Sequence, residues 1–180
     1  MSLVNFSNVL LDKYSEKLKK IQCVLLDVDG ILTDGRVIFM GAEVGWNRFF
    51  NVYDGHGLKL LKENGFKLGI ISGGDSIGLH ERFVNNLGLD PEMCFFGNED
   101  KTGAYDHIKN KHDLRDEQIC YLGDELFDIP LLKQVGFSAT VPESSFIVQR
   151  EVDYVTNKNG GKGAAREVID MILLSQGILK

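Results

Sequence analysis

Residues 24–35 read VLLDVDGILTDG, an apolar run that ends abruptly in two carboxylates followed by glycine. Such a run predicts a buried strand that delivers its acids to one edge of a sheet. Because side chains alternate faces along a strand, Asp27 and Asp29 project to the same side if the strand persists to its end. Two acids on one side can divide the work of a reaction, one attacking the substrate and one moving protons.

The same motif has two other interpretations, a solvated turn and a fragment of a calcium-binding loop. An EF-hand loop would need further oxygen ligands and a glutamate at its last position. Here the apolar Ile31 and Leu32 follow Gly30 directly, which does not fit that ligand pattern. We therefore favour a catalytic role for Asp27 and Asp29.

Length and charge limit the class of protein. A chain of 180 residues favours one domain spanning 1–180. The net charge of −6 at pH 7 argues against a nucleic-acid partner, which would need a basic face. Residues 1–20 predict an amphipathic leading helix rather than a signal peptide, and no stretch approaches the ~18–20 apolar residues of a membrane span. We expect a cytoplasmic protein without membrane contact.

The cysteines do not form a recognisable metal or disulfide pattern. Cys23, Cys94 and Cys120 lie far apart, each in or beside an apolar segment, and are expected to be buried reduced thiols. Neither CxxC spacing nor a paired His-x-x-His cluster is present, which argues against zinc. Any metal should be a hard cation bound by carboxylates.

Short β-like runs alternate with segments of helical period along the chain. This alternation predicts an α/β fold in which helices flank a central parallel sheet, with the site beyond the carboxyl ends of the strands. The expected strands are 22–27, 67–72, 93–96, 118–122 and 137–141, and the expected helices are 57–64, 76–87, 102–111, 126–135 and 163–174.

Residues 36–53 interrupt this alternation. Apolar and aromatic residues flank a turn region between Gly41 and Gly45, which predicts a β-hairpin inserted after the first strand. Its apolar side chains could belong to the core, form an oligomer interface or cap a neighbour's site.

Polar residues follow three other expected strands. Ser72 and Gly73 suit the binding of phosphate oxygens, although Ser-Gly-Gly can also be a simple turn. Lys101 opens a helix, where a cation is unfavourable, and this favours a functional role. Asp124 could cap a helix, but its spacing from Asp128 also suits one shared magnesium ion.

Two further segments each allow two interpretations. His56, beside Asp54, could contact substrate or pack in its loop. The glycine-rich segment 160–163 lacks the spacing of a nucleotide-binding loop. It could bring Lys162 or Arg166 near a substrate carboxylate, or form a turn and helix start.

Taken in order, these motifs resemble the four motifs of the haloacid-dehalogenase-like phosphohydrolases. Segments 27–35, 50–57, 153–156 and 160–168 more narrowly resemble the capless branch typified by 3-deoxy-manno-octulosonate 8-phosphate phosphatase. The resemblance implies a Rossmann-like three-layer α/β/α fold without a separate cap domain. It also implies a magnesium-dependent homotetramer that acts on a sugar-acid phosphate in lipopolysaccharide biosynthesis, with inserted hairpins that help close neighbouring sites.

The resemblance implies a role for each motif. Asp27 would attack phosphorus and Asp29 would serve as acid and base. Magnesium would be held by Asp27, the backbone carbonyl of Asp29 and Asp124, while Asp128 would orient the metal shell or Lys101. The residues implied to bind substrate or phosphate are Ser72, Gly73, Lys101, Thr33, Asp54 and His56.

The chain departs from that branch at three positions. Gly74 and Tyr53 stand where octulosonate phosphatases tend to have arginine, and Glu125 replaces a second aspartate. A related nonulosonate 9-phosphate phosphatase is therefore a second hypothesis. A phospho-accepting receiver domain is a third, but it would lack the spacing of Asp29. A catalytically silent assembly module is a fourth, and the retained Asp27 argues against it.

Overall fold

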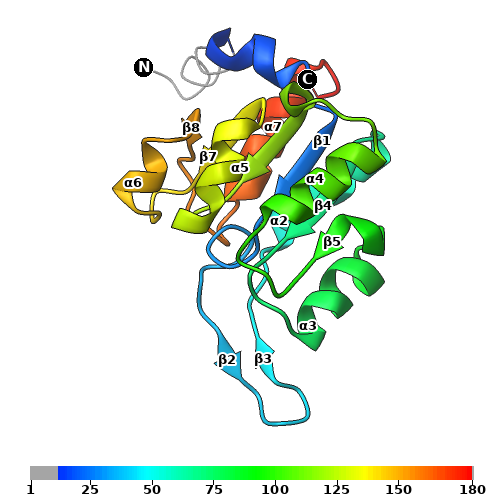
Figure 1. The fold of residues 1–180 in the computed structure, drawn as a ribbon, viewed down its shortest axis with the longest axis vertical. Coiled ribbons are helices and arrows are strands. Elements are labelled where there is room, and N and C mark those ends of the chain that lie inside the picture. Colours follow the sequence, from blue (N-terminus) through cyan, green and yellow to red (C-terminus); the bar gives the residue numbers. More distant parts are fainter. Residues whose placement is uncertain (1–11, 180) are drawn as a thin grey trace.

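The computed structural model describes residues 12–179, which form a six-stranded parallel sheet with helices on both faces (Figure 1). The strand order is β5-β4-β1-β6-β7-β8. These strands are β1 (Cys23–Leu26), β4 (Lys67–Ile71), β5 (Cys94–Phe95), β6 (Ile119–Leu122), β7 (Phe137–Thr140) and β8 (Tyr154–Val155). The predicted Rossmann-like α/β/α fold is confirmed.

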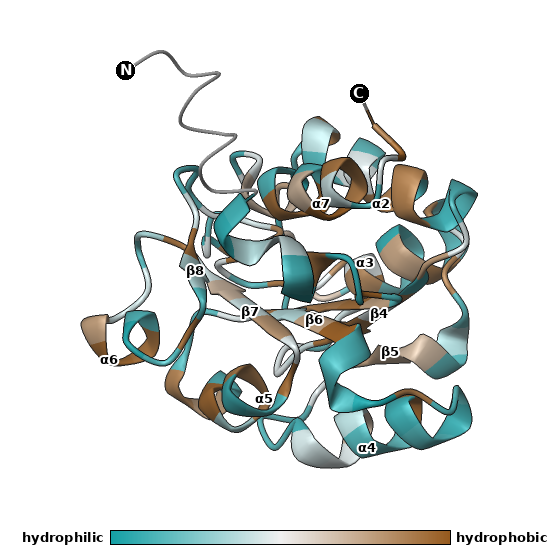
Figure 2. Ribbon diagram, turned by 90° about the horizontal axis from the view of Figure 1, so that it is seen from above, coloured by the Kyte–Doolittle hydropathy of each residue, from teal (hydrophilic) through white to brown (hydrophobic). Residues whose placement is uncertain are grey.

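Helices lie in two layers around this sheet (Figure 2). The layer on one face contains α2 (Val52–Glu63), α3 (Ile77–His80) with its π-helical continuation Glu81–Asn86, and α7 (Ala164–Ser175). The other face is covered by α4 (Thr102–Lys111) and α5 (Ile129–Gln134). The short α6 (Phe146–Gln149) lies between β7 and β8 along the chain.

Strand β1 shows why the sheet is buried on both sides. Val24 and Leu26 belong to the apolar cluster beneath α2 and α7, whereas Cys23 and Leu25 belong to the cluster beneath α4 and α5. Neither face is polar, so the strand reads as a continuous apolar run rather than as an alternating one. Within residues 12–179 all three cysteines are free, as expected, with Cys94 half-buried and the other two buried.

Several boundaries differ from those predicted. The 102–111 helix is confirmed, but α2 begins at Val52 rather than at residue 57, because the Asn51 side chain accepts a hydrogen bond from the Tyr53 N–H and caps the helix. The 126–135 segment begins as a 3-10 turn, Leu126–Asp128, before α5. The sequence did not predict α6 or β8, and such short elements carry little periodicity. Residues 12–18 are helical, and the rest of the expected leading helix includes residues outside the described part.

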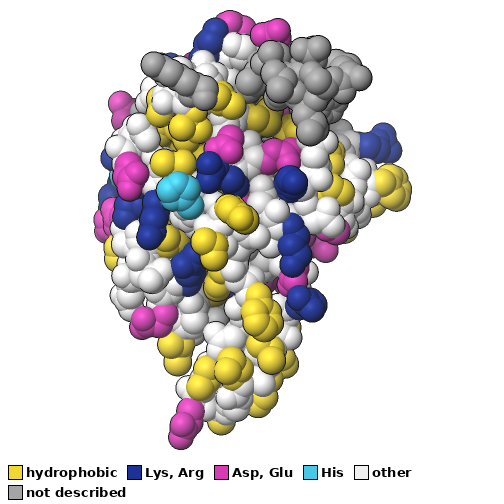
Figure 3. Space-filling view, turned by 180° about the vertical axis from the view of Figure 1, so that it is seen from behind, with side chains coloured by type: hydrophobic (Ala, Val, Ile, Leu, Met, Phe, Trp, Pro, Cys, Tyr) yellow, Lys and Arg dark blue, Asp and Glu magenta, His cyan; other side chains and the backbone are white. Residues whose placement is uncertain are grey.

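The predicted hairpin is present but shorter than 36–53. It consists of the antiparallel strands β2 (Ile38–Phe39) and β3 (Trp46–Asn47), while Val52 and Tyr53 belong to α2. The hairpin projects from the body at the carboxyl end of β1 (Figure 1), and Asp27 is the residue that follows this strand. Apolar side chains gather on its surface (Figure 3).

None of the helices within residues 12–179 has the length and hydrophobicity needed to cross a bilayer.

Candidate active site

Asp27 lies at the carboxyl end of the central strand β1. Its backbone N–H donates to the Leu122 carbonyl at 2.9 Å, so the sheet still holds the residue that follows the strand. Its carboxylate accepts a hydrogen bond from the Val28 N–H at 2.7 Å, and the residue as a whole is only 3% exposed. The sheet therefore presents Asp27 as a fixed, nearly buried carboxylate.

The loop after Asp27 is held by its own backbone and by Thr33. The Leu32 and Thr33 N–H groups donate to the Val28 carbonyl, and the Thr33 hydroxyl accepts from the Gly30 and Gly35 N–H groups at 3.4 and 3.3 Å. The buried Thr33 thus shapes the loop. Gly30 has φ +87°, and a Cβ there would lie 2.1 Å from Asp124 Oδ2, so both conformation and space require glycine.

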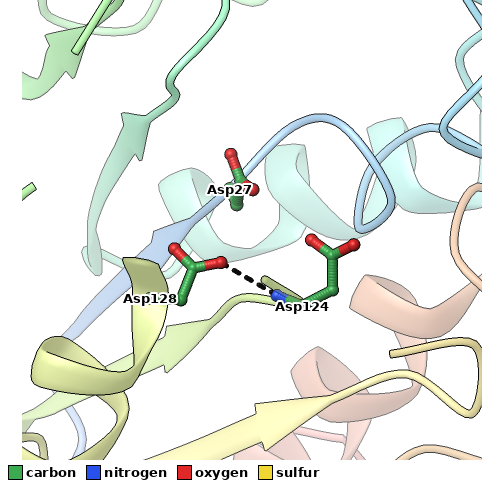
Figure 4. Close-up of side chains that lie close together, drawn as sticks. All are labelled: Asp27, Asp124 and Asp128. Atoms are coloured by element: carbon green, nitrogen blue, oxygen red, sulfur yellow. Dashed lines mark hydrogen bonds between the residues drawn. The ribbon is translucent and has the colours of Figure 1, made fainter. Parts of the chain in front are cut away.

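Three carboxylates converge at this edge of the sheet (Figure 4). One oxygen from each of Asp27, Asp124 and Asp128 lies within 4.8 Å of the others. Asp128 is fully engaged by protein donors: Oδ1 accepts from Lys101 Nζ and Tyr121 Oη, each at 2.6 Å, and Oδ2 accepts from the Asp124 and Glu125 N–H groups at 3.0 Å. Asp124 Oδ1 is buried without a hydrogen-bond partner.

Lys101 connects two of these acids. It is the N-cap residue of α4, and its side chain is buried. Its Nζ lies 2.6 Å from Asp128 Oδ1, 3.1 Å from Asp27 Oδ1 and 4.8 Å from the centre of the Phe127 ring. The unusual place of a lysine at a helix start is thus explained by two buried carboxylate partners.

The acids of the cluster are electrostatically under-compensated. Burial raises the pKa of Asp27 to about 7, with Lys101 opposing this shift and Asp128 adding to it. Burial likewise raises the pKa of Asp124 to about 8, and the neighbouring Asp27 and Asp128 carboxylates add to it. Lys101 brings one positive charge to three carboxylates. The unpartnered Asp124 oxygen and this deficit fit a divalent cation with oxygen ligands, as magnesium requires.

A pocket of about 470 Å³ opens beside the cluster. Ser72 and Gly73 line it at the end of β4, and the Ser72 hydroxyl accepts from the Gly74 N–H at 3.2 Å. The structure thus brings together residues predicted from four separate strand ends. They are Asp27, Asp29, Ser72, Gly73 and Asp124 at the pocket wall, with Lys101 and Asp128 directly behind Asp27.

The structure does not bring Asp54 or His56 to this pocket. Asp54 is buried and accepts from the Gly163 and Arg166 N–H groups at 3.1 and 2.8 Å, so it holds the start of α7. His56 is exposed on α2. The early start of α2 at Val52 places both residues on the helix instead of in a substrate loop.

The glycine-rich segment 160–163 packs against the catalytic loop. The Gly161 N–H donates to the Ile31 carbonyl at 2.9 Å. Lys162 is exposed, with its Nζ 3.7 Å from Asp34, and Arg166 Nε donates to Asp170 at 2.7 Å. Neither Lys162 nor Arg166 lines the pocket. Within this chain the segment therefore forms a turn and the start of a helix, and does not bring a cation to the substrate pocket.

Sequence reasoning missed Arg48. Its guanidinium, from the residue after β3, forms a bidentate ion pair with Asp29. The signal in the sequence is weak: Arg48 is a single cation in the otherwise uncharged stretch 44–53. Tyr121 was also missed, because its position within the apolar β6 predicts plain core packing.

Comparisons with known proteins agree with this geometry. The family model described as haloacid dehalogenase-like hydrolase matches residues 95–168. The curated 3-deoxy-D-manno-octulosonate 8-phosphate phosphatase KdsC of Yersinia pestis is 36% identical over 169 residues, covering 94% of this chain and 88% of that protein. The corresponding protein of Salmonella typhi is 35% identical over 163 residues, covering 91% of this chain and 85% of its own length.

Solved structures show the same similarity. The crystal structure of the Yersinia pestis phosphatase has a TM-score of 0.87 at 35% identity, covering 93% of this chain and 89% of that one. The Moraxella catarrhalis phosphatase, in complex with a magnesium ion, a phosphate ion and KDO, has a TM-score of 0.85 at 35% identity, covering 92% and 93% of the two chains. The predicted resemblance is confirmed: this chain belongs to the 3-deoxy-D-manno-octulosonate 8-phosphate phosphatase family of the haloacid dehalogenase-like hydrolases.

Proposed function

We propose that this chain is a magnesium-dependent phosphatase that hydrolyses 3-deoxy-D-manno-octulosonate 8-phosphate. The observation that carries the proposal is the buried Asp27 carboxylate, which faces a pocket between Asp124 and the phosphate-binding candidates Ser72 and Gly73. The names of the relatives supply the substrate, and the complex of the Moraxella catarrhalis protein supports both the ion and the sugar acid.

Asp27 performs the chemical attack in this proposal. Its carboxylate oxygen displaces the sugar oxygen from phosphorus, and the bond that forms gives an aspartyl phosphate. Lys101 Nζ, 3.1 Å from Asp27 Oδ1, and the Ser72 hydroxyl stabilise the charge on the transferring oxygens. Water then attacks the phosphorus, releases inorganic phosphate and restores the Asp27 carboxylate.

Asp29 moves the protons. It lines the same pocket and donates a proton to the departing sugar oxygen, then takes one from the water that attacks the aspartyl phosphate. This role requires Asp29 to carry a proton when the sugar oxygen departs, while Lys101, 3.1 Å from Asp27 Oδ1, favours the ionised form of the nucleophile.

The cation and its ligands follow from the donor atoms. Asp27, Asp124 and the backbone carbonyl of Asp29 would hold magnesium, which when bound neutralises charge that would otherwise repel an anionic phosphate. Asp128 acts behind them: its carboxylate accepts four hydrogen bonds, which hold Lys101, Tyr121 and the backbone at Asp124 and Glu125. The neutral Thr33 stabilises the loop after Asp27, because its hydroxyl accepts from the Gly30 and Gly35 N–H groups.

A nonulosonate 9-phosphate phosphatase is the second candidate. Gly74 keeps it as a candidate, because this residue lines the pocket with neither the arginine that octulosonate phosphatases tend to have nor the glutamate of the related nonulosonate phosphatase. A silent assembly module is disfavoured because Asp27, Asp29 and Asp124 line one pocket and Lys101 Nζ lies 3.1 Å from Asp27 Oδ1.

The deciding experiment measures phosphate release, with and without magnesium, from eight-carbon and nine-carbon 2-keto-3-deoxy sugar-acid phosphates and from hexose phosphates. Asp27→Asn, which keeps the size of the side chain, is the background control. Magnesium-dependent preference for the eight-carbon acid supports the proposal, and preference for the nine-carbon acid replaces it with the second candidate. Wild-type activity in Asp27→Asn would contradict the nucleophile assignment.

The projecting hairpin supports a homotetramer within the same proposal. Phe39, Met40 and Trp46 are each more than half exposed, and such a concentration of exposed apolar surface is typical of an interface between subunits. A cytoplasmic location and a place in lipopolysaccharide biosynthesis are further parts of the proposal, and the substrate named for the relatives supports the second of these.

A further inference from the structure

Arg48 reaches from the base of the hairpin to the proposed acid and base. Its Nε donates to Asp29 Oδ1 at 2.6 Å and its Nη2 donates to Asp29 Oδ2 at 2.7 Å. The Arg48 side chain is only 6% exposed, although the hairpin beside it is open to solvent. A bidentate pair of short charged hydrogen bonds fixes both the position and the plane of a carboxylate.

Gly74 provides the space for this guanidinium. A Cβ atom at Gly74 would lie 2.5 Å from Arg48 Nη2 and 3.0 Å from Asp29 Oδ2. Gly74 does not have a positive φ, so its backbone conformation is open to other residues. Glycine at this position therefore leaves free the space in which the Arg48 guanidinium meets the Asp29 carboxylate.

The loop after β4 also holds the hairpin. Arg48 Nη1 donates to the Ser76 hydroxyl at 3.2 Å, and the Asn47 side chain lies close to Gly78, where a Cβ would be 2.5 Å from Asn47 Oδ1. Hydrogen bonds to Asp29 raise the pKa of Arg48 against the effect of burial, and Asp27 and Asp75 add to this. Arg48 is thus a charged group anchored on two sides.

We propose that Arg48 is a positioning residue for proton transfer, holding the Asp29 carboxylate at the pocket wall in the space that Gly74 leaves free. The inference rests on the proposed role of Asp29 as acid and base. In its acid form Asp29 carries a proton on one oxygen, and both oxygens keep lone pairs that can accept from Arg48, so Asp29 can bind Arg48 and still direct the O–H toward the leaving oxygen. The hairpin therefore contributes to catalysis through its base, independently of any contact made by its tip.

The test compares two leaving groups. A sugar alkoxide needs a proton as it departs, whereas the weakly basic p-nitrophenolate leaves without one. We expect Arg48→Ala to lower kcat/KM for 3-deoxy-D-manno-octulosonate 8-phosphate by about 10- to 100-fold, part of the ~10²–10⁴ that general acid catalysis contributes. The loss with p-nitrophenyl phosphate should stay below about threefold. kcat/KM is the right parameter because it covers the first chemical step, in which the leaving group departs.

Three further variants sharpen the comparison. Gly74→Ala should reproduce the selective loss, and Arg48→Ala with Gly74→Ala should be no worse than Arg48→Ala alone, because both changes remove one contact. Arg48→Lys keeps a charge but loses the bidentate geometry, and should show a smaller loss of the same kind. Arg36→Ala is the matched control, since the largely exposed Arg36 forms a similar pair with Asp34 and its loss should change neither rate.

Other outcomes would overturn the inference. Equal losses with both substrates would assign Arg48 to the general structure of the site. Weaker binding of the sugar phosphate to Asp27→Asn when Arg48→Ala is added, measured by calorimetry, would make Arg48 a substrate anchor instead. Asp29→Asn serves as the reference: if Asp29→Asn itself shows no leaving-group selectivity, the proposed acid role fails and the inference falls with it. If Asp29→Asn shows leaving-group selectivity and Arg48→Ala does not, the positioning role of Arg48 is rejected and the acid role of Asp29 stands.

Discussion

Gly160 lies directly against Gly30 of the catalytic loop, so that a Cβ atom at Gly160 would fall 1.8 Å from the Gly30 carbonyl oxygen. The next residue, Gly161, donates its N–H to the Ile31 carbonyl at 2.9 Å. Gly30 in turn lies against Asp124. A segment near the end of the chain thus holds the loop that follows the proposed nucleophile.

We expect Gly160→Ala to reduce both stability and turnover. The added methyl group must displace backbone, and overpacking of this kind costs about 1–3 kcal/mol. The unfolding free energy in urea and kcat should fall together. Gly103→Ala is the control, because a Cβ at Gly103 meets no heavy atom within 4 Å and the residue lies in α4. A Gly160→Ala protein with wild-type stability and kcat would contradict this packing argument.

Asp128→Asn should lower kcat strongly and also weaken the fold. The change removes the charge that holds Lys101 Nζ at 2.6 Å, and breaking a buried ion pair costs about 3–5 kcal/mol. Asparagine keeps the shape of the side chain, which limits the loss. Steady-state kinetics and thermal unfolding measure the two effects. Lys133→Ala, which breaks the half-exposed pair with Glu151, should change stability by no more than about 1 kcal/mol. Equal losses of stability in Asp128→Asn and Lys133→Ala would contradict a stabilising role for the buried Lys101–Asp128 pair.

Metal-free protein should become less stable as the pH rises from 5 to 8. The pKa of Asp124 is about 8 in the folded chain against an ordinary 3.8, so the folded state binds this proton more tightly than the unfolded state. The stabilisation that this tighter proton binding gives the folded state is therefore lost as the pH rises through this range. With a chelator present, the Tm of Asp124→Asn should fall less than that of the wild type.

Magnesium provides the internal check on that experiment. Addition of the ion at pH 8 should raise the wild-type Tm and should raise the Tm of Asp124→Asn little, because a ligand stabilises only the state that binds it. Asp106→Asn, an exposed change on α4, should behave as the wild type does. A wild-type Tm that is unaffected by both pH and magnesium would reject the assigned cluster.

Trp46→Glu should dissociate the proposed homotetramer without unfolding its subunits. Trp46 packs against Phe39 with ring centres 5.2 Å apart, yet both remain more than half exposed in one chain. A charge placed there costs little in a monomer and much in an apolar interface. Sedimentation equilibrium reports the mass and circular dichroism reports the fold. Glu43→Gln, in the exposed hairpin turn, is the control. An unchanged mass for Trp46→Glu would show that Phe39 and Trp46 do not lie in a subunit interface.

Much of the site could be predicted because parallel strands end at a common edge. Asp27 and Asp124 follow β1 and β6, which are neighbours in the sheet, and Ser72 follows β4 on the other side of β1. Local patterns that identify the strand ends are enough to gather these residues. The helical period alone left Asp54 and His56 in a loop before residue 57, whereas the Asn51 cap starts α2 at Val52 and places both residues on the helix.

The sequence by itself determined the parallel sheet, the order of the motifs and the acids at the strand ends, because apolar runs and their periods specify which segments are buried and where they stop. Only the tertiary structure decided that Arg48 holds Asp29 over Gly74 and that Gly160 packs on Gly30. Those contacts join segments distant in the chain through side-chain reach and close backbone approach. Local periodicity encodes neither side-chain reach nor close backbone approach, so these contacts form only when the sheet and its loops are assembled.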